Sequence, residues 1–365
     1  MQLFKHCSLI LLGFLFIYSQ QSVATEFCAT TSAGLEFALA ASEANGESDV
    51  IRIAEGAYDA PVGGFYYDSH ENYDLEISGG WSEFFGNACG QQVSPDAFGT
   101  VLDGNGTERV MTIRSGLGSD ITVSNIFFLN GFVTGPGQRG GGLNVFTREG
   151  YTGDVLIENN TFISNSAKYE GALHVSRGHR IVVRNNLFTV NHAEAGSAVG
   201  IVNNDAWGVY FTNNTVYQNT TDSTHPTNAG GFYLSTSGTS SALVANNIFW
   251  NNDNFDIRSS GDGYKYLRNN DYQSFSGSFD EVSMNIQVAP EFESGWFNYT
   301  PVYNSPLVNA GRTPPPFVPI PPPFVSDWSV GTVDIYGDVR IQNTQIDIGA
   351  VESPHGDLIF IDGFE

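Results

Sequence analysis

The chain has few basic residues, and this shortage excludes whole classes of partner. Lys and Arg together number 15 against 39 Asp and Glu, which gives a formal net charge of −24 at pH 7. Such a charge repels phosphate backbones and anionic lipid, so we expect no binding to nucleic acid and no electrostatic adhesion to an anionic membrane. The charge suits an extracellular protein that self-repulsion keeps soluble, or one that takes up cations.

Long apolar runs are also lacking, apart from one short run near the start of the chain. Lys5 precedes the run LILLGFLFIY at residues 9–18, and small residues follow at Ser22, Val23 and Ala24. This order predicts a secretory signal peptide over residues 1–24. The run is too short to span a bilayer comfortably, and nothing later approaches 18 apolar residues. We therefore expect no transmembrane segment after signal removal, with a retained N-terminal anchor as the alternative.

Cysteine is scarce, with three residues in all. Cys7 lies inside the predicted signal peptide, so Cys28 and Cys89 remain in the mature chain. In an oxidising compartment such a pair favours a disulfide over two free thiols. The bridge would tie the start of the mature chain to the first part of the fold.

What the chain does have is a phrase repeated six times: an apolar residue, a spacer, Asn, usually a second Asn, a spacer, and another apolar residue. The copies begin at Val123, Ile157, Val183, Phe211, Val244 and Leu267. The first asparagines of successive copies are 34, 26, 28, 33 and 23 residues apart. Periods in this range with strand-like alternation indicate a solenoid in which each repeat is one turn of the chain, with roughly ten turns in all.

The phrase also predicts what each of its positions does. The apolar residues that begin and end each copy would stack in two inward-facing columns, because side chains alternate along a strand. The asparagine between them would bend the chain, since Asn tolerates the left-handed conformation, and stacked asparagines would hydrogen-bond as a ladder. A second mark falls six residues after the first Asn of five copies, at Gly131, Asn165, Asn191, Asn219 and Asn252.

The segments before and after the repeats differ from them. Residues 25–287 are predicted to form the solenoid together with an N-terminal cap. Within residues 32–45, Leu35, Ala38, Leu39 and Ser42 fall on one helical face, which predicts a short helix that covers the open end of the solenoid. Residues 288–352 form a different C-terminal region, interrupted by the Pro-rich insert TPPPFVPIPPPF at 313–324. We interpret the insert as an extended surface loop, with a partner ligand as the alternative.

The repeats, together with the C-terminal motifs NSPLVNAG (304–311), DIYGDVR (334–340) and DIGAVE (347–352), resemble a known family. They are similar to secreted right-handed parallel β-helix proteins of the pectin-lyase-like superfamily, including polymorphic outer-membrane-protein-like repeats, and the C-terminal motifs look like a choice-of-anchor region. The resemblance covers roughly residues 32–352. It implies an all-β, right-handed parallel β-helix solenoid and export, but no single reaction. The Pro-rich insert interrupts the usual spacing between Gly311 and Asp334.

The acidic tail at residues 353–365 ends in LIFIDGFE and looks like the short tails of exported proteins in some Gram-negative bacteria. It is interpreted either as a sorting signal or as a final strand. We therefore expect a protein that is secreted, extracellular or held on the outer surface of a Gram-negative cell, and that is a monomer.

Charged residues gather between positions 139 and 194, where six of the 15 Lys and Arg fall. Proton abstraction beside a uronate carboxylate requires a base and a cationic group, and a basic patch on an acidic body would attract uronate or sulfated sugars. The candidate catalytic residues are Lys168, Glu170, His174, Arg177 and His179, and the candidate binding residues are Arg180, Arg184, His192 and Glu194. In the alternative, Arg184 and Glu158 form an ion pair on a solvated sheet, worth under about 1 kcal/mol.

Enzyme motifs are missing, which sets the functional prediction. The chain lacks the paired-Asp phrases that galacturonan hydrolases carry and the strand-borne Arg and Pro motif of pectate lyases. We therefore predict non-catalytic adhesion or binding of an extracellular polysaccharide or cell-surface glycan, with a polysaccharide lyase or hydrolase as the alternative. No cofactor is required. Ca²⁺ is kept as an alternative ligand, because Asp253, Asp256 and Asp262 could bind it, although their spacing matches no defined calcium-binding loop.

Overall fold

The computed structural model describes residues 24–84, 88–94, 96–204, 208–225, 228–295, 297–313, 324–325, 327–342 and 345–354. The predicted signal peptide up to residue 23, residues 314–323 of the Pro-rich insert, and residues 355–365 of the acidic tail lie outside these described residues.

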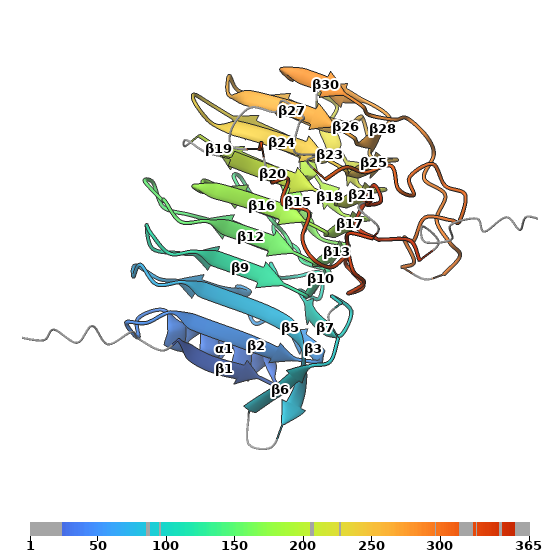
Figure 1. The fold of residues 1–365 in the computed structure, drawn as a ribbon. Coiled ribbons are helices and arrows are strands. Elements are labelled where there is room, and N and C mark those ends of the chain that lie inside the picture. Colours follow the sequence, from blue (N-terminus) through green and yellow to red (C-terminus); the bar gives the residue numbers. More distant parts are fainter. Residues whose placement is uncertain are drawn as a thin grey trace, which may run out of the picture.

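The chain winds into a right-handed parallel β-helix whose coils stack from the N-terminus upward (Figure 1). Sheet A holds ten stacked parallel strands in its described part, which agrees with the roughly ten turns predicted. They are β1 (Thr25–Ala29), β2 (Asp49–Ala54), β5 (Leu75–Phe84), β9 (Ile121–Ser124), β12 (Val155–Glu158), β16 (Arg180–Arg184), β20 (Gly208–Thr212), β24 (Ser241–Ala245), β27 (Tyr264–Arg268) and β30 (Glu281–Ser283).

Sheets B and C form the other long faces of the column. Sheet B contains β3 (Gly56–Asp59), β7 (Thr100–Asp103), β10 (Phe127–Leu129), β13 (Thr161–Ile163), β17 (Leu187–Thr189), β21 (Thr215–Tyr217), β25 (Ile248–Trp250) and β28 (Asp271–Tyr272). Sheet C contains β4 (Phe65–Asp68), β8 (Met111–Arg114), β11 (Leu143–Phe146), β15 (Glu170–Ser176), β19 (Ser197–Asn203), β23 (Ala229–Thr236), β26 (Phe255–Ser260) and β29 (Phe275–Ser276). Between sheets B and C, the short sheet D contains β14 (Ser166–Ala167), β18 (His192–Ala193) and β22 (Thr220–Thr221).

Both predicted columns of apolar residues are confirmed by the strand register. In sheet A, Ile157 pairs with Val123 on one side and Val183 on the other, and the column continues to Leu267. In sheet B, the rings of Phe128 and Phe162 stack with centroids 4.7 Å apart, and Phe188 follows at 4.8 Å. These side chains are fully buried, so the core is one continuous dry column.

The two asparagines of each repeat have different roles. The first lies at the corner between sheets A and B with a left-handed backbone, and φ is 54° at Asn159 and 53° at Asn185. The second forms the ladder: the Asn160 amide donates to Asn186 Oδ1 at 3.2 Å, and Asn186 donates to Asn214 Oδ1 at 3.0 Å. The ladder continues through Asn247, Asn270 and Asn285. Fully buried amides are thus satisfied by their neighbours one coil away.

The second predicted mark is a second ladder. The Gly131 N–H donates to Asn165 Oδ1 at 2.8 Å, and Asn165 Nδ2 donates to Asn191 Oδ1 at 3.0 Å. The ladder continues through Asn219 and Asn252. It marks the corner between sheets B and D, so each coil in this stretch is fixed in register at two corners.

Helix α1 (Ser32–Ser42) lies beside the first coils and contacts β1, β2 and β4 (Figure 1). Its buried residues are the four predicted from the sequence, Leu35, Ala38, Leu39 and Ser42. Thr31 Oγ1 accepts from the Gly34 N–H at 3.1 Å and so caps the helix. In the part of the chain that the structure describes, no helix has the length and apolarity needed to cross a bilayer.

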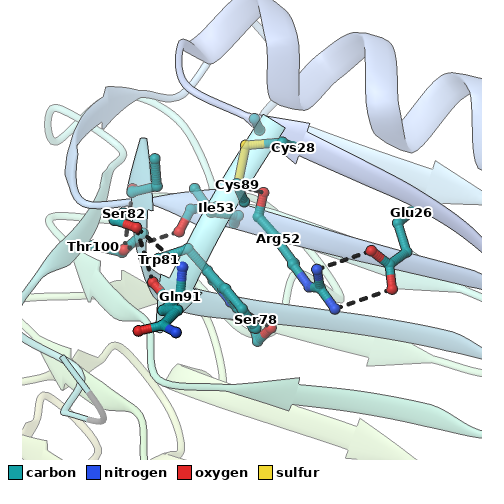
Figure 2. The surroundings of a disulfide bond; sticks show 12 residues. Glu26, Cys28, Arg52, Ile53, Ser78, Trp81, Ser82, Cys89, Gln91 and Thr100 are labelled. Atoms are coloured by element: carbon teal, nitrogen blue, oxygen red, sulfur yellow. Dashed lines mark hydrogen bonds and ion pairs between the residues drawn. A yellow bond between two sulfur atoms is a disulfide. The ribbon is translucent and has the colours of Figure 1, made fainter. Parts of the chain in front are cut away.

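The predicted disulfide is present and joins Cys28 on β1 to Cys89 on β6 (Ala88–Gln92). Strand β6 pairs antiparallel with the end of β5 and folds back over the first coils. Figure 2 shows Arg52 beside the bridge, where its guanidinium lies 4.3 Å from the Trp81 ring and 2.8 Å from Glu26. The bridge therefore fastens the hairpin to the edge strand of sheet A.

The described residues of the C-terminal segment, 288–354, pack on the outside of the middle coils rather than adding coils to the stack (Figure 1). Its side chains Phe324, Trp328, Val330 and Ile346 cover Val182, Tyr210, Leu243 and Ala245 on sheet A. The corner asparagines hold it as well, since Asn185 Nδ2 donates to Val330 O at 3.0 Å and Asn246 Nδ2 donates to Arg312 O at 2.8 Å.

The motifs at 334–340 and 347–352 form a buried polar network inside this segment. Arg340 is fully buried, and its Nη2 donates to the Asp347 carbonyl at 2.9 Å. The Glu352 N–H donates to Asp334 Oδ2 at 2.7 Å, and the Ser353 N–H donates to Asp347 Oδ2 at 2.6 Å. The charged residues of the motifs therefore hold loop backbone in place.

Candidate functional site

The structure distributes the predicted site residues over separate faces of the column. Lys168 Nζ lies 2.8 Å from Glu194 Oε2 on the turns that follow sheet D. His192, on β18, contacts the Thr220 hydroxyl at 3.0 Å and Asp222 at 3.3 Å. These residues form one row of polar contacts between neighbouring coils.

A second group lies on and around sheet A. His179 Nδ1 lies 3.0 Å from Asp154, and Arg180 Nη2 lies 2.8 Å from Asp327 of the C-terminal segment. The expected ion pair between Arg184 and Glu158 is present at 2.7 Å. Arg177 follows β15 with a φ of 60°, and its guanidinium reaches the Thr147 carbonyl at 3.5 Å. Each of these side chains therefore has a partner in the scaffold.

Of the nine candidates, Arg180 and Arg184 line one groove in the described part of the chain, and Glu170 lines another. The groove at Glu170 has a volume of about 430 Å³ and lies on the outer face of sheet C, where β15, β19, β23 and β26 run side by side. Its walls come from the turns that enter these strands. The lining residues are Arg139, Tyr169, Glu170, Ala195, Gly196, Ser197, Ser223, His225, Asn228, Ala229, Tyr233 and Arg258.

The lower end of the groove, at β15, is built around an ion pair whose carboxylate is buried. Arg139 Nη1 donates to both carboxylate oxygens of Glu170, at 2.6 and 2.8 Å, and its guanidinium lies 4.7 Å from the Tyr169 ring centre. Glu170 is 2% exposed and fits beside Gly200, where a Cβ would come within 2.4 Å of Glu170 Cγ. Burial raises the pKa of Glu170 to about 7, although Arg139 acts in the opposite direction.

His174 lies behind Glu170, on the same strand. It points away from the core, as the alternation predicts, but it is only 3% exposed. Its Nδ1 lies 3.5 Å from Glu170 Oε2. Burial, helped by the charges of Arg139 and Arg109, lowers the pKa of His174 to about 3, so the imidazole is neutral at physiological pH.

The upper end of the groove, at β23 and β26, repeats the combination of tyrosine and arginine. The Arg258 guanidinium lies 5.3 Å from the Tyr233 ring centre and donates to Asn228 Oδ1. Asn228 is fixed in turn, since its Nδ2 donates to the Ala195 carbonyl at 3.1 Å. The Tyr233 hydroxyl lies 2.9 Å from Ser260 Oγ. The Tyr233 ring is thus held in place beside a guanidinium, and the Tyr169 ring lies beside Arg139 at the other end.

Tyr169, Asn228, Tyr233 and Arg258 were not among the residues predicted from the sequence. In the strand register, Gly200 pairs with His174 on one side and Tyr233 on the other, and Tyr233 pairs with Arg258. The sequence signal for this column was the glycines at 171, 196 and 230–231 that begin sheet C. This signal does not reach Arg258, because β26 begins at Phe255 without a glycine.

In the described residues, no three or more His, Cys, Asp or Glu side chains are grouped so that they could hold a metal ion. The three aspartates considered for calcium accept hydrogen bonds from backbone at separate places. Asp253 accepts from Thr221 N at 3.1 Å, Asp256 from Gln273 N at 2.8 Å, and Asp262 from Gly238 N at 3.0 Å.

Comparison of the chain with protein-family models, with curated proteins and with solved structures finds no match. The fold and the chemistry of the groove therefore carry the functional argument. An aromatic face beside a guanidinium suits a ring that carries polar or anionic substituents, because a C–H face of the ring can pack on the tyrosine while the guanidinium binds an oxyanion.

Proposed function

We propose that the chain is a secreted or surface-exposed β-helix protein that binds an extracellular glycan in the sheet C groove, for adhesion and without chemical change. The observation that carries the proposal is the pairing of a tyrosine with an arginine at each end of one groove. The stiff column presents this groove at a fixed position on its surface.

Sequence motifs support a wider context for this proposal. The repeats and the motifs at 304–311, 334–340 and 347–352 favour membership of the pectin-lyase-like superfamily with a choice-of-anchor-like C-terminal region. The segment at residues 1–24 favours export, and the acidic tail favours an outer-surface or extracellular location in a Gram-negative bacterium. We propose a monomer, because the net charge of −24 opposes self-association.

A glycan array tests the binding function. The protein from residue 25 onward is compared with Tyr233→Ala and Arg258→Ala, which remove the ring and the cation at the upper end of the groove. We expect each variant to lose about tenfold or more in affinity, as expected for about 1.4 kcal/mol or more of lost contact. Tyr66→Ala and Arg114→Ala are matched controls on the outer face of sheet C, outside the groove. Equal loss in the controls, or no glycan binding by the wild type, would refute the proposal.

The alternative is a polysaccharide lyase or hydrolase, and one observation favours it. A pKa of about 7 would let Glu170 transfer protons at neutral pH. Hydrolysis needs a second carboxyl group, however, and among the described residues that line the groove Glu170 is the only one with a carboxyl group.

Enzyme assays separate the two functions. The protein is incubated with pectate, alginate and chondroitin, in alkaline buffer with calcium and in mildly acidic buffer, while unsaturated products and reducing ends are followed. Turnover that Glu170→Gln abolishes would establish the enzyme. Binding on the array without turnover would support adhesion.

A further inference from the structure

We propose that ligand binding in the groove is coupled to uptake of one proton. An oxyanion of the ligand replaces Glu170 as the partner of Arg139, and Glu170 becomes a neutral acid that donates a hydrogen bond to His174. The inference rests on the proposed function, because the ligand occupies the same groove. Its ligand class is a sugar that carries a carboxylate or sulfate group.

The first step concerns Arg139, the cation that neutralises Glu170. Arg139 bonds to both oxygens of the carboxylate. Its side chain is 35% exposed, whereas the side chain of Glu170 is 3% exposed. An anion that enters from solvent therefore reaches the guanidinium and not the carboxylate, and can compete for the same N–H donors.

The second step concerns the charge left behind. A buried carboxylate that loses its counterion is strongly disfavoured, and it takes up a proton unless another cation replaces the first. The remaining cations near the groove are already bound. Arg109 donates to the carbonyls of Gly140 at 3.0 Å and Arg139 at 3.1 Å, and to Gln138 Oε1 at 2.7 Å. Arg258 donates to Asn228 and lies on β26, roughly three strand spacings, or about 14 Å, from β15.

The neighbours of Glu170 on β15 and β19 supply no replacement cation. From its own strand His174 is neutral, and from β19 the neighbours are Ser197 and the bare backbone of Gly200. Tyr233 of β23 and His225 also line the groove. Apart from Arg139, the described lining of the groove holds one other Lys or Arg side chain, Arg258, and this guanidinium is bound to Asn228.

The third step concerns the atom that accepts a hydrogen bond from the protonated Glu170. His174 Nδ1 is buried and has no hydrogen-bond partner, and it lies 3.5 Å from Glu170 Oε2. Buried polar atoms without partners are rare in folded proteins. A protonated Glu170 would donate to this nitrogen. The balance is then one proton taken from solvent, with Arg139 and the ligand oxyanion forming the new ion pair and no covalent bond changed.

Titration calorimetry tests the coupling. The protein from residue 25 onward is titrated at pH 8 with a galacturonate hexamer, a chondroitin sulfate hexasaccharide and neutral cellohexaose, each in two buffers of different ionisation enthalpy. We expect uptake of about one proton per bound carboxylated or sulfated ligand, and an affinity that falls up to tenfold per pH unit above about pH 7. Glu170→Gln should bind the same ligand with no proton uptake and little dependence on pH. Tyr66→Ala should retain the uptake.

The possible outcomes separate this inference from the proposed function. Binding of an anionic sugar without proton uptake, or with the same uptake in Glu170→Gln, overturns the coupling and leaves glycan binding standing. No binding of any of the three sugars to the wild type overturns both. If Glu170→Gln does not fold, infrared difference spectra of the wild type decide, because the coupling requires a protonated carboxyl signal to appear when the ligand is added.

Discussion

At the scale of single residues, neighbouring asparagines with the same side chain do different work. Asn185 turns the corner with its backbone in the left-handed region, while Asn186 is fully buried and links three coils. The Asn186 amide donates to Ile157 O at 2.9 Å and to Asn214 Oδ1 at 3.0 Å, and its oxygen accepts from the Asn160 N–H at 2.9 Å. The ladder position should therefore be the sensitive one.

Asn186→Ala should lower the free energy of unfolding by about 3 kcal/mol or more, because it leaves several buried donors and acceptors without partners. Denaturant titration followed by circular dichroism measures the change. Asn159→Gly is the matched control. Its amide oxygen has no hydrogen-bond partner, and glycine adopts its φ of 54° without strain, so we expect a change within about 0.5 kcal/mol. The reverse order of the two effects would refute the division of roles.

Glu352 gives the C-terminal segment a pH-dependent stability. Burial raises the pKa of this carboxyl from 4.5 to about 8 in the folded protein, so the folded state keeps the proton to higher pH than the unfolded chain. Its contribution is fully present below pH 4.5 and is lost as the pH rises toward 8. Glu352→Gln should match the wild type near pH 5 and be the more stable of the two near pH 8. Melting curves that stay parallel across this range would contradict the prediction.

At the scale of elements, the disulfide should stabilise the N-terminal coils. It closes a loop across a sequence separation of 61 residues, which corresponds to about 4 kcal/mol of lost entropy in the unfolded chain. Reductant, or Cys28→Ser with Cys89→Ser, should lower the melting temperature, and reductant should then have no further effect on the double variant. Peptide mapping without reductant should recover the two cysteines as one linked species. Free thiols by alkylation would refute the bridge.

The stacked strands could be predicted from the sequence, whereas the groove could not. Sheets A and B flank the repeated asparagine phrase, so the spacing of the phrase places Ile157 beside Val183 and Phe162 beside Phe188. Sheet C follows turns of differing length, and the same spacing does not bring Tyr233 next to Arg258. The residues predicted from local density of charge meet only in part. Glu170 lies beside His174, whereas Lys168 and Arg180 belong to the same coil but to other faces of it.

At the scale of the whole molecule, the excess of negative charge should make stability depend on salt. Asp74, Asp120 and Asp154 stand on successive coils, where the Asp120 N–H donates to Asp74 Oδ1 at 2.9 Å and the Asp154 N–H donates to Asp120 Oδ1 at 2.8 Å. Raising NaCl from about 10 mM to about 150 mM shortens the Debye length from about 30 Å to about 8 Å, which weakens this repulsion.

We expect this change to raise the melting temperature by about 1–2 °C, as for about 1 kcal/mol of stabilisation in a chain of this length. Sucrose at matched osmolality controls for solvent effects that do not involve charge. A melting temperature that falls with NaCl would mean that ion pairs outweigh the repulsion.

The path of the C-terminal segment sets the order in which the molecule can be completed. A ribosome makes the coils from the bottom of the column upward, and each new turn can settle on the one below it. Tyr210 and Leu243, however, stay exposed until Trp328 and Ile346 have been made and can cover them. Until more than a hundred further residues have been made, the incomplete column exposes an apolar stripe on sheet A, to which a chaperone would bind.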